Sequence, residues 1–305
     1  MKTLILFHDE CLNHDPGPRH PERPDRVSAV LSKIQTAAGT EVLPAPLASR
    51  KQICRAHTQE YWQKLVDLEP ERDPVALDPD TFLSPGSLKA SLRASGAACF
   101  AVDQVFAGKA QNAFCVVRPP GHHAESDLAM GFCLFNHVAV AARHALAEHG
   151  IERVAILDFD VHHGNGTQAI FEQSPEVLYI SSHQMPLYPG SGHADEIGCG
   201  NILNLPLAPH SGSSEFRTAW STLGLPALHG FQPNLVIISA GFDAHKYDPL
   251  GELELEDEDF SWITREVREF ADQNCGGRLI SVLEGGYDLD ALASASLAHV
   301  GALTA

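Results

Sequence analysis

The chain of 305 residues has few basic side chains. It contains 21 Lys and Arg against 39 Asp and Glu, which leaves a formal net charge of −18. A general nucleic-acid binder needs a basic face that displaces counterions from phosphates, so this balance excludes direct nucleic-acid binding as the expected function. An acidic surface instead favours cationic or neutral substrates.

The sequence also lacks a long apolar run and a secretory signal. No run approaches the roughly 20 residues that span a bilayer, and the first ten residues have no extended apolar region that leads to a cleavage site. We therefore expect a cytoplasmic protein without membrane contact. The seven cysteines are odd in number, widely spaced and free of any CxxC pair, which excludes a disulfide framework and a cysteine-based zinc finger. No feature predicts an oligomeric state.

Short apolar runs rich in β-branched residues alternate with longer segments that favour helices. The runs are residues 3–7, 113–117, 154–157, 177–180, 235–239 and 279–283, and the helical segments are 26–37, 87–107, 136–149, 213–229 and 256–272. This alternation predicts βαβ units, and the uninterrupted apolarity of the runs predicts a parallel sheet covered on both faces. Ser87 and Ser213 stand where helix N-caps are expected.

A polar segment follows nearly every predicted strand. These segments begin at His8, Arg118, Asp158, Ser181, Ala240 and Glu284. In open α/β sheets ligands bind outside the carboxyl ends of the strands. We therefore expect the six segments to lie together at one edge of the sheet.

The segment Asp158-Phe-Asp-Val-His162 is the most informative of the six. In an extended chain residues two apart face the same side, so Asp158, Asp160 and His162 are expected to point one way while the two apolar residues pack. Asp160 and His162 with Asp243 supply one imidazole and two carboxylates. That set suits a catalytic Zn²⁺ or Fe²⁺ with an open position for water. The alternative is that these groups only cap strand ends.

Two further motifs offer catalytic groups. Consecutive side chains diverge in extended structure, so His122 and His123 are expected to act as acid and base and not as ligands of one metal. Asp158 and Asn165 are candidates to fix the ring tautomers. Tyr287, in Glu-Gly-Gly-Tyr, offers a phenol that can stabilise an oxyanion. The alternatives are a surface turn that carries two histidines and a tyrosine that only packs.

Together the motifs resemble the zinc-dependent histone deacetylase superfamily, whose motif order they follow. They read Arg118-Pro-Pro-Gly-His-His-Ala124, Gly131-Phe-Cys133, Asp158-Phe-Asp-Val-His-His-Gly-Asn-Gly-Thr-Gln168, Tyr188-Pro-Gly-Ser-Gly192, Ser239-Ala-Gly-Phe-Asp-Ala-His245 and Leu283-Glu-Gly-Gly-Tyr287. The resemblance runs from about His20 to Tyr287. Asn165 and Glu284 make it nearest to the class II type, a group that includes bacterial histone-deacetylase-like amidohydrolases and acetylpolyamine amidohydrolases.

The resemblance implies an α/β protein of the arginase/deacetylase fold. It implies a single catalytic domain over residues 1–305, with a central eight-stranded parallel sheet flanked by helices. The implied activity is a metal-dependent amidohydrolase that removes acetyl or other acyl groups from amines. Its substrates would be acetylated lysine in proteins or peptides, or acetylated small amines.

The resemblance also implies a role for each matching residue. Asp160, His162 and Asp243 match the zinc ligands, with Fe²⁺ as the alternative metal. The catalytic matches are His123 as general base and acid, His122 paired with Asp158 as its electrostatic partner, Asn165 behind the base, and Tyr287 as the oxyanion donor. Phe132, Tyr188, Gly131 and Leu250 match the acyl-lysine channel, and Arg26 matches an arginine near the acetate exit. A structural K⁺ would take Asp158, Ser181 and Ser182 with backbone oxygens of Asp160 and His162.

The sequence departs from the family in two places. His137 stands where the family usually has Asn, and the pattern offers no account of it. Leu250 stands where polyamine-selective enzymes have a gatekeeping Glu, which weakens the alternative of an acetylpolyamine deacetylase. Two further alternatives are an arginase-like ureohydrolase with two Mn²⁺ and a non-catalytic binder of acylated amines. The first needs additional carboxylates, and the second should have lost a ligand, a tandem histidine or the tyrosine.

Overall fold

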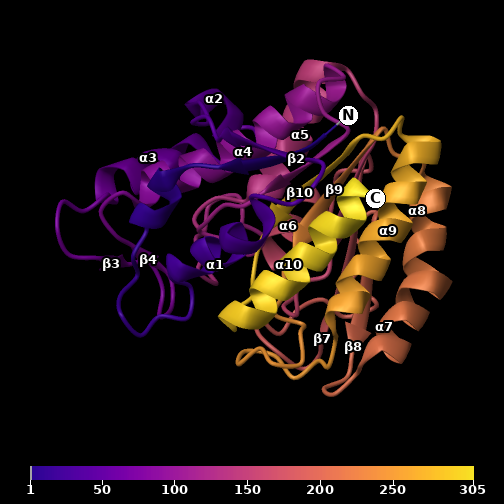
Figure 1. Ribbon diagram of the computed structural model, residues 1–305. Helices are drawn as coiled ribbons and strands as arrows, with labels where there is room; N and C mark the ends of the chain where they lie inside the picture. The colour runs from indigo at the N-terminus through magenta and orange to yellow at the C-terminus, as the bar shows by residue number, and fades with distance from the viewer. Residues whose placement is uncertain (1) are drawn as a thin grey trace.

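The computed structural model describes residues 2–305, and a parallel sheet of eight strands forms its centre (Figure 1). The strands lie in the order β2-β1-β5-β10-β9-β6-β7-β8. They are β1 (Thr3–Phe7), β2 (Thr40–Pro44), β5 (Asn112–Cys115), β6 (Val154–Asp158), β7 (Val177–Gln184), β8 (Ile202–Leu207), β9 (Leu235–Ala240) and β10 (Leu279–Leu283). A separate antiparallel pair joins β3 (Val75–Ala76) to β4 (Phe82–Leu83). The predicted α/β fold with an eight-stranded parallel sheet is confirmed.

Helices cover both faces of the sheet. They are α1 (Asp25–Ile34), α2 (Arg50–Ile53), α3 (Gln59–Leu68), α4 (Ser87–Phe106), α5 (His137–His149), α6 (Asn165–Phe171), α7 (Ser213–Ala219), α8 (Leu225–Phe231), α9 (Asp257–Asn274) and α10 (Leu289–Thr304). In Figure 1 helices α7 to α10, coloured orange to yellow, lie on one side, and α4 and α5 lie on the other. A π-helical turn at Trp220–Gly224 divides the segment that the sequence predicts as one helix.

Alternate residues of each strand pack into two different cores. Leu4 and Leu6 of β1 belong to the core beneath α4 and α5, whereas Ile5 between them belongs to the core beneath α9 and α10. Because both faces of the sheet are covered, the central strands are apolar on both faces over most of their length. This arrangement explains why the strands show no alternation of polar and apolar residues.

The structure corrects the predicted helix starts. Ser87 and Ser213 are the first helical residues, and the N-cap positions belong to Gly86 and Gly212. Each serine hydroxyl has another partner: Ser87 accepts the backbone N–H of Ser84, and Ser213 donates to a carboxylate oxygen of α9. The sequence analysis also missed the edge strands β2 and β8 and the helix α10.

The sheet order brings the motif-bearing strands together. β5, β10, β9, β6 and β7 are consecutive neighbours, so the polar segments that follow them share one edge of the sheet. Asp158 at the end of β6 pairs in register with Ser181 on one side and Ser239 on the other. Within residues 2–305 no helix combines the length and apolarity that a membrane span requires.

Candidate active site

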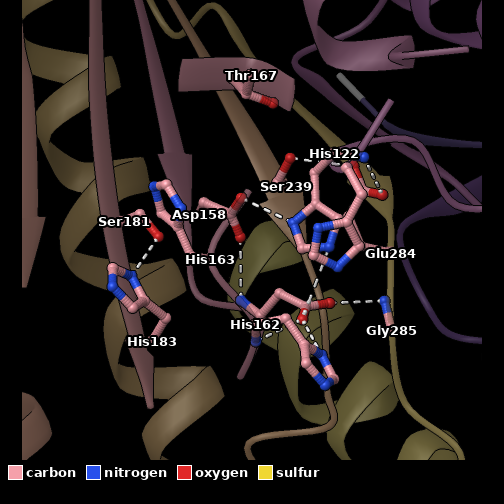
Figure 2. Close-up of polar contacts among 12 residues, drawn as sticks. His122, Asp158, His162, His163, Thr167, Ser181, His183, Ser239, Glu284 and Gly285 are labelled. Carbon is pink, nitrogen blue, oxygen red and sulfur yellow. Dashed lines mark hydrogen bonds and ion pairs between the residues drawn. The ribbon is translucent and has the colours of Figure 1, made fainter. Parts of the chain in front are cut away.

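The segment after β6 turns sharply and carries its polar side chains to one side. The backbone N–H of Asp160 donates to Oδ1 of Asp158 at 3.1 Å, and the N–H of His162 donates to Oδ1 of Asp160 at 2.9 Å. Phe159 and Val161 are buried, as the sequence predicts. The chain is bent after Asp158 and not extended, yet the bends keep the expected division between polar and packed residues. Figure 2 shows Asp158 and His162 at this turn.

One imidazole and two carboxylates converge at this turn. Nδ1 of His162 lies 3.1 Å from Oδ1 of Asp160 and 3.1 Å from Oδ2 of Asp243, which comes from the segment after β9. One ligand atom from each residue lies within 4.8 Å of the others, and all three residues are buried. Burial and then the neighbouring Asp160 carboxylate raise the pKa of Asp243 to about 7. A divalent cation at this point would neutralise two buried carboxylates that otherwise repel each other.

Two glycines allow the backbone to approach the carboxylates of the candidate ligands closely. A Cβ atom at Gly241 would overlap Oδ2 of Asp160, and a Cβ atom at Gly285 would overlap Oδ2 of Asp243. Neither glycine has a positive φ angle, so space and not backbone conformation requires the absence of a side chain. The ligand chemistry and the burial fit a Zn²⁺ or Fe²⁺ ion.

The tandem histidines lie beside this cluster, and each has its own partner. Nδ1 of His122 lies 3.0 Å from Oδ2 of Asp158, and Nδ1 of His123 lies 2.9 Å from Oδ1 of Asn165. The structure therefore brings together the pairs expected from the sequence. It corrects the expectation that the rings diverge, because their centroids lie only 4.1 Å apart. The two residues form a turn and not an extended segment, so the alternation of strand side chains does not apply.

The environments of the two rings shift their pKa values in opposite directions. Burial alone would lower the pKa of His122, but the carboxylates of Asp160 and Asp158 outweigh burial and raise it to about 10. Burial, followed by the positive charge on His122 and His162, lowers the pKa of His123 well below its usual range. Without a bound metal, these shifts favour the cation of His122 and the neutral form of His123, which can accept a proton.

A cavity of about 250 Å³ leads from the surface to the cluster. It is lined by Asp80, His123, Gly131, Phe132, His162, Leu187, Tyr188, Leu250 and Tyr287. The rings of Phe132 and Tyr287 meet edge to face at 5.8 Å. The channel residues expected from the sequence line this cavity, except Arg26. The guanidinium of Arg26 lies behind Tyr287, 4.8 Å from its ring centroid.

The sequence analysis missed several residues at the site. Asp80 and Leu187 line the cavity, but Asp80 lies between the two short strands outside the main sheet, where the rule about strand ends gives no signal. Glu22 is fully buried between two arginines, with its carboxylate 2.7 Å from Arg118 and 3.1 Å from Arg26. Arg26 also donates from Nε to the carbonyl of Gly286 at 2.6 Å, which ties this ion-pair network to the Tyr287 segment.

The structure accounts for His137, which the sequence left unexplained. Its ring is buried at the start of α5, with Nδ1 2.8 Å from the hydroxyl of Ser95 and Nε2 3.0 Å from the carbonyl oxygen of Pro119. His137 thus connects α4 to the segment that precedes the tandem histidines. Its role is structural support for that segment.

The potassium candidates lie behind the cluster. Asp158 is fully buried at the end of β6, and Ser181 and Ser182 follow on the neighbouring strand β7. The hydroxyl of Ser182 accepts from the indole N–H of Trp220 at 3.0 Å. Figure 2 shows Ser181 and Asp158 on adjacent strands.

A second group with metal-ligating side chains lies on α4 and α5. Asp103, His144 and His149 bring their ligand atoms together, with Oδ1 of Asp103 2.9 and 2.8 Å from the two Nε2 atoms. However, Nη1 of Arg55 lies 2.9 Å from Nδ1 of His144. Arginine only donates, so Nδ1 must accept and Nε2 must carry the proton that it gives to Asp103. The group is therefore a hydrogen-bond network that fastens two helices.

The fold and this site define the arginase/deacetylase class of α/β enzymes. A sequence profile of the histone deacetylase domain matches residues 20–303, nearly the whole chain. The chain therefore belongs to the histone deacetylase family.

Individual relatives agree with this assignment. The chain is 39% identical over 311 residues to a histone deacetylase-like amidohydrolase of Pseudomonas aeruginosa, covering 94% of this chain and 82% of that protein. It is 38% identical over 299 residues to a probable deacetylase of Archaeoglobus fulgidus, covering 95% and 82%. Among solved structures it resembles the crystal structure of the HDA15 HD domain, with a TM-score of 0.90 and 36% identity over 99% of this chain and 90% of that chain. The protein is thus a deacetylase, a hydrolase that acts on acylated amines.

Proposed function

We propose that the protein is a zinc-dependent deacylase of acyl-lysine side chains, with one catalytic domain over residues 1–305. The observation that carries the proposal is the convergence of Asp160, His162 and Asp243, with His162 lining a cavity whose wall also includes Tyr287. A chain that belongs to the histone deacetylase family and keeps this arrangement has both the ligands and the access route that amide hydrolysis requires.

The cavity suits a long substrate arm that ends in an amide. Phe132, Tyr188 and Leu250 give it apolar walls, against which the methylene stem of a lysine side chain can pack while the acyl group reaches the base. Placing the amide between the metal ligands and the phenol converts hydrolysis into a reaction of positioned groups, which is worth several kcal/mol of the barrier.

Asp160, His162 and Asp243 would hold Zn²⁺, or Fe²⁺ as the alternative. The bound ion supplies Lewis acidity, which polarises a carbonyl group and lowers the pKa of water. We assign a structural K⁺ to Asp158, Ser181 and Ser182 with backbone oxygens of Asp160 and His162, because these groups supply the hard oxygen ligands that such a cation prefers.

The chain's own residues move the protons. His123, neutral and with Nε2 free, takes a proton from the attacking water. Tyr287 donates its phenolic hydrogen to the oxyanion that develops on the substrate. His123 then gives its proton to the leaving amine, and the carboxylate and the free amine separate. His122, held as a cation by Asp158, stabilises the negative charge that accumulates nearby.

An acetylated small amine is the second candidate substrate. The net charge of −18 and the carboxylate of Asp80 at the cavity favour a cationic substrate, whereas Leu250 provides no charge that would select a polyamine. We therefore rank acetyl-lysine in proteins or peptides first.

A kinetic comparison with the zinc-loaded protein tests the proposal. We expect turnover of a fluorogenic acetyl-lysine amide, loss of turnover with a chelator or a hydroxamate, and a lower kcat/KM for acetylpolyamines than for acetyl-lysine peptides. Longer acyl-lysines in the same assay define the acyl preference. Binding of the acetyl-lysine amide without turnover would instead support the non-catalytic alternative.

A further inference from the structure

Glu284 is a buried carboxylate that the proposed mechanism does not use. It follows β10 directly and is fully enclosed. Oε2 accepts the backbone N–H of Gly121 at 2.6 Å and that of His122 at 3.1 Å, and Oε1 accepts the hydroxyl of Ser239 at 3.0 Å. All three donors are neutral groups, so these contacts do not form an ion pair. Figure 2 shows Glu284 beside His122 and Ser239.

The two N–H groups need a partner that the sheet does not provide. β5 ends at Cys115, and the chain then leaves the ladder before it reaches Gly121 and His122. A buried backbone N–H without a partner costs roughly 1–3 kcal/mol, so the position of this backbone depends on the carboxylate that accepts from it. On its other side Gly121 is packed closely, because a Cβ atom there would overlap the backbone of His137.

The main chain around Glu284 contacts the other half of the site. The N–H of the next residue, Gly285, donates to Oδ2 of Asp160 at 2.8 Å, and the same segment carries Tyr287. Arg26 donates to the carbonyl oxygens of both Glu284 and Gly286. The Glu284 side chain therefore connects the segment that carries the tandem histidines to the segment that carries the phenol.

We propose that Glu284 is a positioning residue that fixes the His122–His123 backbone relative to the Gly285–Tyr287 segment. A histidine ring has only two rotatable bonds, so a shift of its backbone moves the ring by a similar distance. A misplacement of about 1 Å can cost about 10²-fold in rate. The role rests on the proposed deacylase function, and it depends on the reach of the side chain and not on its charge.

Two conservative substitutions separate reach from charge. Glu284→Gln keeps the length: its amide oxygen can accept both N–H groups, and its NH₂ can donate to Ser239. Glu284→Asp keeps the carboxyl group but is one methylene shorter, so it cannot hold both contacts. We expect kcat within about fivefold of wild type for Glu284→Gln and about 10²-fold lower for Glu284→Asp, with KM within threefold and bound metal unchanged in both.

The matched control is Ser239→Ala, which removes the contact to Oε1 and leaves both N–H contacts. It is expected to keep kcat within about threefold. A second measurement does not depend on turnover: the amide proton resonances of Gly121 and His122 should stay near their wild-type positions in Glu284→Gln and move upfield in Glu284→Asp.

The outcomes are distinct. If Glu284→Asp is at least as active as Glu284→Gln and the amide resonances do not move, the positioning role is overturned. The charge at position 284 is then what matters. If wild-type protein fails to hydrolyse any acyl-amine, the proposed function fails, whereas the amide resonances of the two variants still confirm or contradict the positioning role.

Discussion

Nδ1 of His123 lies 2.9 Å from Oδ1 of Asn165, and this contact sets the proton on the ring. The amide of Asn165 is oriented by its own NH₂ group, which donates to Glu125 at 3.0 Å. Its oxygen therefore faces His123 and can only accept, so Nδ1 carries the hydrogen and Nε2 has the free lone pair. An amide orients the ring without adding a charge that would favour the imidazolium.

Asn165→Asp should move the acidic limb of the kcat/KM profile to higher pH. In the wild type, burial and then the neighbouring His122 lower the pKa of His123, so the limb should lie below pH 6.5. A carboxylate at position 165 stabilises the protonated ring and raises its pKa, which should shift the limb upward by about one unit or more. Asn165→Ala is the control, with reduced kcat and no upward shift. An unmoved limb in Asn165→Asp would exclude His123 as the titrating base.

Tyr287→Phe should lower kcat by roughly 10²–10³-fold, because it removes one donor to the developing oxyanion. The phenol is not among the metal ligands, so the metal content of the purified variant should equal that of wild type. Tyr188→Phe is the matched control, since Tyr188 also lines the cavity but has no assigned proton donor role. Equal turnover of Tyr287→Phe and wild type would contradict the oxyanion role.

Asp243→Asn should bind metal weakly and yet be more stable than wild type when both are stripped of metal. Burial and Asp160 raise the pKa of Asp243 to about 7, above its unfolded value near 3.8. A carboxyl group with a raised folded pKa destabilises the fold increasingly as pH rises from about 4 to 7, and the amide removes this penalty.

Thermal unfolding at pH 8 with and without Zn²⁺ measures both effects of Asp243→Asn. Saturating metal at 100 times its Kd stabilises the wild type by about 2.7 kcal/mol and should raise its Tm by several degrees, whereas the variant should shift little. If Zn²⁺ raises the Tm of Asp243→Asn as much as that of wild type, Asp243 is not a metal ligand.

Leu250→Glu should shift the preference toward acetylated polyamines. Leu250 lines the cavity, so a carboxylate there faces the part of the substrate that lies outside the acyl group. An ion pair in a partly exposed place is worth up to about 1 kcal/mol, so the ratio of kcat/KM for acetylspermidine over acetyl-lysine peptide should rise about fivefold. Glutamine has about the size of glutamate but no charge, so Leu250→Gln should leave the ratio of kcat/KM values unchanged. Equal ratios in the two variants would show that charge at this position does not select the substrate.

His137→Ala should destabilise the protein by about 2 kcal/mol at neutral pH, since it leaves two buried polar partners unsatisfied. Burial lowers the pKa of His137 to about 4, below its unfolded value near 6.5. The stability that His137 contributes is therefore present above pH 6.5 and is lost as pH falls toward 4. The difference in free energy of unfolding between wild type and His137→Ala should become smaller as the pH is lowered. Urea unfolding at pH 7.5 and 5 measures this, with the exposed His229→Ala as control. A difference that does not depend on pH would contradict the buried neutral state of His137.

Most strands of the central sheet could be predicted because they are apolar on both faces over most of their length and are followed by polar or Gly-rich residues. β10 begins and ends at the predicted residues, and β6 extends the prediction by one. The edge strand β2 could not be predicted, because most of its residues are partly or fully exposed and are not apolar throughout. α10 was missed for a different reason: it is rich in Ala and Ser and shows no polar face that marks a helical period.

Within the site, residue types at strand ends indicated the proposed metal ligands and the tandem histidines. The sequence could not place what reaches the site from elsewhere. Asp80 comes from the turn of a small antiparallel pair. Glu22 contacts two buried arginines, Arg26 four residues along the chain and Arg118 in a distant segment. Such contacts depend on how distant segments pack, and a periodic pattern along the chain does not predict them.

The two glycines beside the ligands limit how this enzyme can be redesigned. Because any side chain at Gly241 or Gly285 would occupy the volume next to Asp160 and Asp243, a mutant library that varies either position yields proteins with a blocked centre. Variation aimed at new substrate arms belongs at Phe132 and Leu250, which line the cavity without belonging to the metal-ligand cluster, so replacement there changes the width of the passage.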